Sequence, residues 1–359
     1  MITLEHKLVY DEEDPNYILL HEIMDIVDSR KTKMIMARNG FKNINDKLNS
    51  IKIVILSIFF ENDLSYTVDQ LKDNEKLKDA FNIDEVPDID KMYNKLSNLD
   101  VDSLEKTVNS ILGSFVTRKH GQRKRFIIDA TPADLNINHR SKKITRKDLE
   151  DKDYAWGWGT AIGYYIGYKV TLVLEHETKL PVYFMVERGS PSDAKMIPKI
   201  LPKLIRKRII KKGDYIYFDR GYYSYENYNF VLRKYQIVSL ILPKENYKKG
   251  KLEDILSYPL DTYKLSKKEQ KKAKEQYERL VRELLECLDK PKRIKYNRGF
   301  IEDFFKIMKV NLGFKNLNKF TLNSIRRHTA LTVLIAGLIV HLRIKTKSDF
   351  QRFSEGKLI

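Results

Sequence analysis

Two aspartates in this sequence each follow a short apolar run typical of a buried strand. Asp129 ends "RFIID", and Asp219 ends "YIYFD" with Arg220 directly after it. Catalytic groups of α/β proteins collect at the carboxyl ends of strands. Carboxylates that meet there repel one another, and Mg²⁺, which prefers oxygen ligands, relieves that repulsion. We therefore expect a metal site suited to in-line attack on a phosphodiester, a reaction that two ions roughly 3.5–4 Å apart assist.

Other common reaction centres are missing from the sequence. It contains no H-E-x-x-H motif and no G-x-x-x-x-G-K-[ST] loop, and Cys287 is its single cysteine. A phosphatase of the haloacid dehalogenase type needs D-x-D, but Thr131 stands at the second position. We interpret the glycine-rich "GWGTAIG" as a turn with packing glycines. Trp156 and Trp158 could stack on unpaired bases, although packing is the preferred interpretation.

The charge of the chain is distributed unevenly. The 359 residues carry a net charge of +18; residues 1–120 hold 16 basic and 22 acidic side chains, net −6, and residues 121–359 hold 51 and 27, net +24. A merely lysine-rich composition would raise lysine throughout. A basic excess confined to one region attracts polyanions, and counterion release makes nucleic acid the expected partner.

Periodicity divides the chain at about residue 120. Residues 15–115 are mostly apolar-faced helical segments, and we expect residues 1–120 to form an all-helical region. Its net −6 favours packing, dimerisation or recognition of DNA ends over a dominant role in gripping DNA. Residues 121–359 then form the second predicted domain.

The second domain combines strands with helices. Residues 167–189 predict an antiparallel hairpin that turns at 176–180, and alternating helices and strands follow. An insertion at about residues 244–293 contains a charged amphipathic helix, Ser266–Leu288, and another helix follows it. This order is that of a ribonuclease-H-like α/β fold, a mixed sheet flanked by helices. In that fold the first and fourth strands are neighbours, so Asp129 and Asp219 would point into one cleft.

The segments "IIDATPAD", "YFDRGYYSYENY" and "NRGFIEDFFKIMK" together resemble the DDE transposases of bacterial and archaeal insertion sequences. They are most similar to the branch with a Tyr-Arg-Glu-Lys signature on its last catalytic helix. In that signature arginine lies four residues before the glutamate and lysine seven after it, as Arg298, Glu302 and Lys309 do here. The tyrosine is displaced by one place, because Lys295 occupies its position and Tyr296 follows. The resemblance covers roughly residues 121–345, and the helical region is similar as well.

The resemblance implies a role for each of these residues. Asp129, Asp219 and Glu302 would be the catalytic, metal-binding triad for two Mg²⁺ ions, with Mn²⁺ as a substitute. The DNA-binding residues would be Arg298, Lys309, Arg220 and Tyr296. On one continuous helix Arg298, Glu302 and Lys309 would share a face. The family's insertion is largely β, and the helical insertion of this chain departs from it.

Simpler structural roles exist for each acid. Asp129 could form a turn, Asp219 could pair with Arg220, and Glu302 could be one helix acid among several. Glu283 and Glu286 are its rivals, but we expect them to be surface charges. We also expect Asp193 to cap a helix rather than bind a metal.

The predicted function is a transposase that cleaves DNA at the ends of its element and transfers the strand into target DNA. It would act as a homodimer on double-stranded DNA, with no small-molecule substrate, in the prokaryotic cytoplasm near the nucleoid. Two alternatives remain: a nuclease or resolvase of the same fold without strand transfer, and an inactive, domesticated DNA-binding protein. The apolar run Ala330–Val340 has eleven residues, short of the roughly 20 that span a bilayer, so no membrane is expected.

Overall fold

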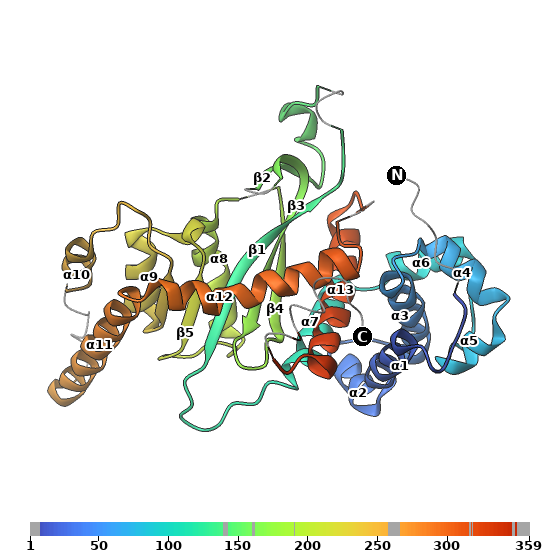
Figure 1. Cartoon of the computed structure of the whole chain (residues 1–359), viewed down its shortest axis with the longest axis horizontal. Coiled ribbons are helices and arrows are strands. Elements are labelled where there is room, and N and C mark those ends of the chain that lie inside the picture. The colour runs from blue at the N-terminus through green and yellow to red at the C-terminus, as the bar shows by residue number, and fades with distance from the viewer. Residues whose placement is uncertain are drawn as a thin grey trace.

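The computed structural model describes residues 8–138, 143–159, 162–189, 191–257, 266–315, 317, 319–346 and 349 (Figure 1). Three predictions extend beyond these residues: the insertion at 258–265, the glycine-rich stretch at 160–161, and the outer limits of the two domains at 1–7 and 350–359. The remainder of the chain can be compared with the sequence-based expectations.

The amino-terminal region is helical, as predicted. Its seven described helices are α1 (Pro15–Asp28), α2 (Arg30–Arg38), α3 (Ile44–Phe59), α4 (Leu64–Lys72), α5 (Glu75–Ala80), α6 (Ile89–Ser97) and α7 (Val101–Gly113). Side-chain caps fix several of their starts. The Asp14 carboxylate accepts from the Asn16 amide at 2.7 Å, and Asp100 accepts from Ser103 at 2.8 Å. Such caps satisfy amides that the first helical turn leaves without partners.

The rest of the described chain is a mixed sheet with flanking helices. The strands are β1 (Arg125–Asp134), β2 (Ala155–Gly159), β3 (Gly163–Glu175), β4 (Pro181–Arg188), β5 (Tyr215–Phe218) and β6 (Val238–Ile241). The helices are α8 (Asp193–Arg206), α9 (Tyr225–Tyr235), α10 (Lys249–Ser257), α11 (Lys267–Leu288), α12 (Pro291–Lys306) and α13 (Leu322–Arg343). Three short turns complete the set: η1 (Lys147–Leu149), η2 (Arg220–Tyr222) and the π-helical η3 (Ile307–Asn311).

The strand order confirms the ribonuclease-H-like α/β fold. β1 pairs antiparallel with β3, which pairs antiparallel with β4, whereas β1, β5 and β6 run parallel. The predicted hairpin is the β3–β4 pair, and the predicted first and fourth strands are the neighbours β1 and β5. Parallel strands need a crossover, and α9 supplies it between β5 and β6, beginning where the Ser224 hydroxyl accepts from the Asn227 amide at 3.0 Å.

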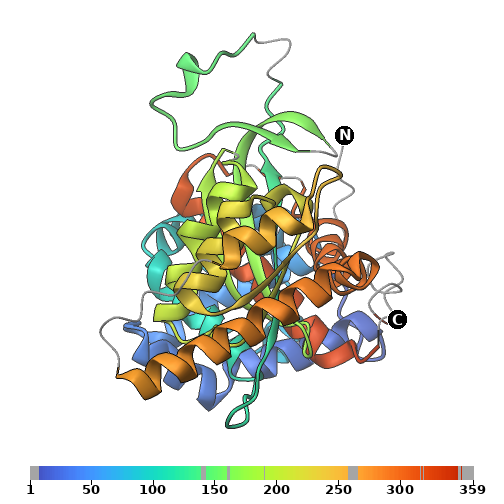
Figure 2. The same cartoon turned by 90° about the vertical axis from the view of Figure 1, so that its left-hand side faces the viewer.

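The glycine-rich stretch differs from its prediction. Residues 155–159 form β2, a strand that pairs with the start of β3, and the two strands project from the body as a ribbon (Figures 1 and 2). Gly157 was correctly expected to be a packing glycine, since an added Cβ would lie 2.3 Å from the Tyr165 ring. Trp158 was expected to pack, but 55% of its surface is exposed. A five-residue strand with two glycines carries little strand propensity, so the sequence suggests a turn.

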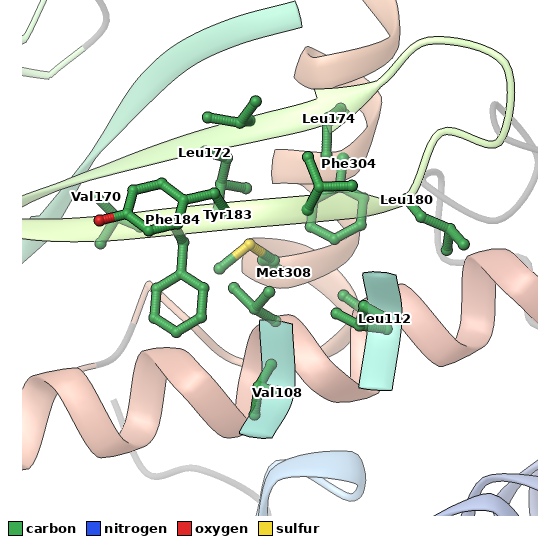
Figure 3. Close-up of a cluster of buried hydrophobic side chains, with 14 of the residues drawn as sticks. Val108, Leu112, Val170, Leu172, Leu174, Leu180, Tyr183, Phe184, Phe304 and Met308 are labelled. Atoms are coloured by element: carbon green, nitrogen blue, oxygen red, sulfur yellow. The ribbon is translucent and has the colours of Figure 1, made fainter. Parts of the chain in front are cut away.

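An apolar core joins the sheet to helices from both halves of the chain. Alternate residues of β3, among them Val170, Leu172 and Leu174, gather with Leu112 of α7 and Phe304 of α12 (Figure 3). All five side chains are at most 2% exposed. Because successive side chains of a strand point to opposite faces, this set marks the face of the sheet that α7 and α12 cover; the intervening residues of β3 are buried as well.

The last helix, α13, lies between the two regions. It contacts α1, α3 and α7 of the helical region and β4 of the sheet. Gly337 permits the closest approach, because an added Cβ would lie 2.6 Å from Leu112 and 3.3 Å from Pro181. In the described part of the chain, α13 is also the one helix long and apolar enough to cross a membrane. Its apolar window is 72% buried inside the protein, as in the core helix of a soluble protein.

The described part of the insertion is helical, as predicted. Ser266 and Glu269 form a capping box at the start of α11. Glu286 is exposed as expected, but the prediction for Glu283 was wrong. Glu283 accepts two hydrogen bonds from the Arg123 guanidinium, at 3.0 and 2.7 Å, and one from the Tyr215 hydroxyl at 3.1 Å. It therefore fastens α11 to the sheet, a tertiary contact that helical periodicity alone does not reveal.

Candidate active site

The strand register places the two predicted aspartates side by side. Ile128 of β1 lies opposite Phe218 of β5 in parallel pairing. One residue further along each strand are Asp129 and Asp219, and neighbouring strands are roughly 4.8 Å apart. β5 ends at Phe218, and the chain turns into η2 directly after Asp219. The prediction that a strand ends at Asp129 was wrong, because β1 continues to Asp134 in its pairing with β3. Asp129 lies midway along β1, level with the carboxyl end of β5, so the two carboxylates still come together there.

Helix α12 adds two more charged groups to this edge. It packs against β1 and β5 and carries Arg298 and Glu302 one turn apart. The Arg298 guanidinium contacts all three acids: Nη1 lies 2.8 Å from Asp129 Oδ2, Nε lies 3.5 Å from Asp219 Oδ1, and Nη2 is paired with Glu302 Oε1. Asp129, Asp219 and Glu302 thus converge on one cation, and Arg298, expected to contact phosphates, serves in this structure as their shared partner.

At this edge three carboxylates share one cation, Arg298, and the pKa values of Asp129 and Arg298 are shifted. Burial raises the pKa of Asp129 to about 7; Arg298 and the Ala130 amide oppose that rise, and Asp219 and Asp193 add to it. Burial lowers the pKa of Arg298, but the three acids outweigh it and raise the pKa above its ordinary value. The Asp129 side chain is 16% exposed, against 41% for Asp219 and 53% for Glu302. The acid cluster is therefore covered at Asp129 and open toward solvent at the other two acids.

A fourth acid, Asp193, which we expected to cap a helix, lies close enough to this group to raise the pKa of Asp129. Asp193 is the first residue of α8, whose N-cap residue, Ser192, makes no side-chain capping hydrogen bond; Asp193 Oδ1 pairs with Lys169 Nζ at 2.5 Å. A Cβ on Gly221 would lie 2.7 Å from Asp193 Oδ2, so only glycine lets η2 approach this closely. Beneath it, the Tyr222 ring is fully buried, and burial, then Asp129 and Asp193, raises its pKa well above the ordinary value. The segment "GSPSDAK" shows an acid at a helix start, which suggests a cap, and it does not reveal the ion pair with Lys169.

The other predicted site residues are spread around the same region. Arg220 is exposed on η2, and Tyr296 is 55% exposed on α12, where its ring meets Phe300 edge-on. Lys309 does not lie on a continuous α-helix with Glu302, because α12 ends at Lys306 and a π-helical turn follows. Burial lowers the pKa of Lys309, with Asp134 opposing that shift. The widened turn rotates Lys309 away from the position that regular helical spacing predicts.

The donor chemistry of the edge suits a hard divalent cation. Its three acids offer only oxygen ligands, outnumber the single cation that pairs with them, and include Asp129, whose pKa burial raises. Within the described residues no three His, Cys, Asp or Glu side chains are close enough together to hold an ion directly. The Arg298 guanidinium lies between Asp129, Asp219 and Glu302 and occupies their centre. The three carboxylates are therefore of the right type for a metal and converge on one point.

Comparison with known protein families agrees with the fold. Residues 120–338 match the sequence model of a protein family described as the transposase DDE domain. The match covers more than half of the chain, which therefore belongs to the DDE transposase family. This family is generally divalent-metal dependent and cytoplasmic. Among curated proteins, no sequence matches the chain.

Proposed function

We propose that this chain is a transposase of the Tyr-Arg-Glu-Lys branch that cleaves DNA at its element ends and transfers the strand into target DNA. The observation that carries the proposal is the convergence of Asp129, Asp219 and Glu302, from three separate elements, on Arg298. Residues 121–359 would be the catalytic domain, and residues 1–120 would recognise ends or mediate a homodimer that holds two ends together.

Each side chain has a part that follows from its place. Asp129 is the most buried of the three and is held by the Ala130 amide at 2.8 Å, so it fixes the inner wall of the site. Asp219 and Glu302 are more exposed and face the side from which DNA arrives. Two Mg²⁺ ions, with Mn²⁺ as a substitute, would activate the attacking oxygen and stabilise the leaving oxygen when bound. Arg298 then becomes available to a DNA phosphate, as do Arg220 and Tyr296 at the rim and Lys309 behind it.

The test is cleavage of a labelled duplex made from the DNA that flanks the gene, with Mg²⁺ present. Asp129→Asn, Asp219→Asn and Glu302→Gln should each slow cleavage by about a thousandfold or more, equivalent to roughly 4 kcal/mol of transition-state stabilisation. DNA affinity should remain within a few-fold of wild type. Glu286→Gln removes an exposed glutamate from the neighbouring helix and should leave cleavage unchanged.

Two results would redirect the proposal. An active Glu302→Gln variant together with an inactive Glu286→Gln variant would move the third acid into the insertion. Cleavage without joining to a target plasmid would favour the nuclease or resolvase alternative. If the wild-type chain bound end DNA but never cut it, the domesticated DNA-binding protein would be the better description.

A further inference from the structure

A second charged site lies at the opposite end of β1, where the strand begins. A cavity of about 540 Å³ opens there between α7 of the helical region and the turn that follows α8. Its lining includes six cations and no acid: Lys106, Arg118, Lys124, Lys207, Arg208 and Lys211. Polar side chains that can donate hydrogen bonds, Asn39, Asn109 and Ser110, also line it. None of these residues belongs to the acid cluster.

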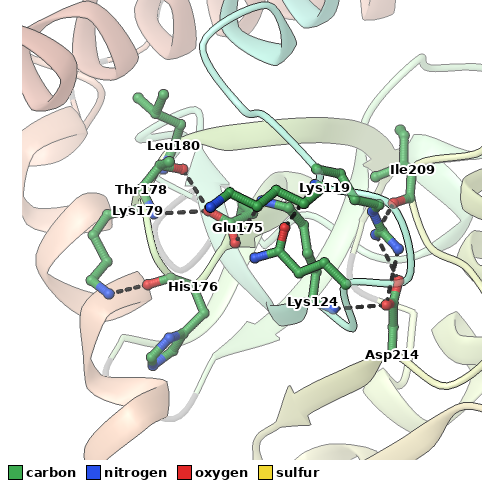
Figure 4. Close-up of polar contacts among 11 residues, drawn as sticks. Lys119, Lys124, Glu175, His176, Thr178, Lys179, Leu180, Ile209 and Asp214 are labelled. Carbon is green, nitrogen blue, oxygen red and sulfur yellow. Dashed lines mark hydrogen bonds and ion pairs between the residues drawn. The ribbon is translucent and has the colours of Figure 1, made fainter.

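Two of the six cations, Arg118 and Lys124, form the floor of the cavity, and each is paired with a carboxylate (Figure 4). Arg118 donates to both carboxylate oxygens of Asp214, at 3.0 and 2.8 Å, and to the Ile209 carbonyl at 3.1 Å. Lys124 is 3% exposed, and its Nζ lies 3.3 Å from Glu175 Oε1. These pairs hold the floor rigid without adding net charge, and they keep Asp214 and Glu175 from neutralising the rim.

The other four cations of the lining form the rim of the cavity, and they differ from the floor pair in exposure and in ion pairing. Lys106, Lys207, Arg208 and Lys211 are all exposed, and within the described residues no carboxylate lies within ion-pair distance of any of them. They come from α7 and from the short segment after α8, so two separate elements direct positive charge at one concavity. Four like charges around a concave surface create a positive potential that favours an anion.

We propose that this cavity binds phosphate groups, at a site separate from the catalytic edge. A polyphosphate-class anion fits because lysine and arginine cations with asparagine and serine donors match the oxygens of adjacent phosphates. The volume exceeds what a single phosphate needs and suits two or more linked ones. The phosphates can come from a free anion or from a DNA backbone, and both sources present the same chemistry.

The experiment measures pyrophosphate binding by calorimetry at low ionic strength in EDTA, which removes divalent ions from the acid cluster. Wild type should bind saturably, and Lys207→Gln/Arg208→Gln should weaken the affinity at least tenfold. The matched control, Lys267→Gln/Lys268→Gln, removes two exposed cations from the start of α11 and should change the affinity less than twofold. Circular dichroism and thermal unfolding establish that both double variants fold.

A second arm identifies the source of the phosphates. A short duplex is added to Asp129→Asn protein loaded with pyrophosphate. Release of pyrophosphate by the duplex, together with weaker duplex binding by Lys207→Gln/Arg208→Gln, assigns the cavity to a DNA backbone, whereas retention of pyrophosphate assigns it to a free anion. Absence of saturable binding, or equal weakening in the control, overturns the proposal. Neither result bears on the triad, because no step in this experiment depends on cleavage.

Discussion

Two groups of charged side chains lie along β1, one at its amino end and one level with the carboxyl end of β5, and their charges are balanced differently. At the amino end, Asp214 pairs with Arg118 and Glu175 pairs with Lys124, one base for each acid. At the carboxyl end, three acids share Arg298. Both arrangements consist of carboxylates and basic side chains, but they differ in the ratio of acids to bases.

The difference separates a structural network from a reactive site. A paired network satisfies its own charges, so it holds elements together and has little affinity for a further ion. A cluster with surplus negative charge is under repulsion, which a divalent cation or a substrate cation can relieve. The surplus at the carboxyl end is therefore the property that would suit it to chemistry, and the predictions below test whether the two ends respond differently.

The largest effect is expected from breaking the balanced end. Asp214→Ala leaves Arg118 and the amides of Lys124 and Lys211 without their shared acceptor. The free energy of unfolding should fall by about 3–5 kcal/mol. Asp129→Asn, which relieves repulsion, should cost less than about 1 kcal/mol. Urea unfolding in EDTA measures both, and equal losses would erase the proposed distinction between the two ends.

Removing the shared cation of the unbalanced end should have the next largest effect. Arg298→Gln leaves three acids facing one another, so stability in EDTA should fall by about 2–3 kcal/mol. Mg²⁺ should then raise the melting temperature more in this variant than in wild type, because the guanidinium no longer competes for the carboxylates. Arg293→Gln, at an exposed position of the same helix, is the control. A Mg²⁺ shift no larger than that of wild type would contradict the competition.

The two ends should respond to pH with opposite signs. The pKa of Asp129 rises from 3.8 to about 7, so between these values the folded state binds more protons and stability falls as pH rises. Burial raises the pKa of Glu175, but hydrogen bonds from Thr178 and the charge of Lys124 outweigh it and lower the pKa below 4.5. Stability from Glu175 is therefore present above that pH and is lost as pH falls below it.

Urea midpoints measured in EDTA across pH 3–8 give a profile of stability against pH, with an acid limb below about pH 4 and a second limb above it, and they test both contributions. Asp129→Asn should flatten the limb above about pH 4, and Glu175→Gln should flatten the acid limb. Each group contributes at most about 1.4 kcal/mol per pH unit. A wild-type profile that rose steadily from pH 4 to pH 7, unchanged in Asp129→Asn, would place the raised pKa elsewhere.

The smallest effect is expected from single DNA contacts at the carboxyl end. Lys309→Ala should weaken binding of end DNA about two- to fivefold and reduce the salt slope by about one unit, if its ammonium neutralises one phosphate. Tyr296→Ala removes an exposed ring without charge and should leave the slope unchanged. Filter binding of Asp129→Asn protein over a range of salt gives both values, and an unaltered slope in Lys309→Ala would exclude the phosphate contact.

The meeting of Asp129 and Asp219 was predictable because each follows an apolar strand run and the fold order makes the two strands parallel neighbours, although β1 continues past Asp129 to Asp134. The helical insertion was predictable for a similar reason, since Ser266 and Glu269 mark its start locally. Both features depend on short-range regularities that a single sequence displays.

The features that could not be predicted are tertiary. Arg298 was expected to face DNA, and spacing along a helix does not say which carboxylates lie across from it. The position of Asp193 beside the acid cluster depends on the absence of a side chain at Gly221. The pairing of Glu283 depends on Arg123, which is 160 residues away in the chain. The π-helical turn that shifts Lys309 arises from packing, which overrides the regular helical period.

The placement of α13 between the two regions has a consequence for how the protein is made. Helices α1 and α3 complete their packing only against a helix that begins at Leu322, more than 200 residues after α7 ends. At ribosomal rates of roughly 5–20 residues per second, the helical region waits on the order of 10–50 seconds for that partner. A chain that stops before residue 322 leaves both regions unfinished. Complete packing of both regions therefore requires synthesis to continue through α13.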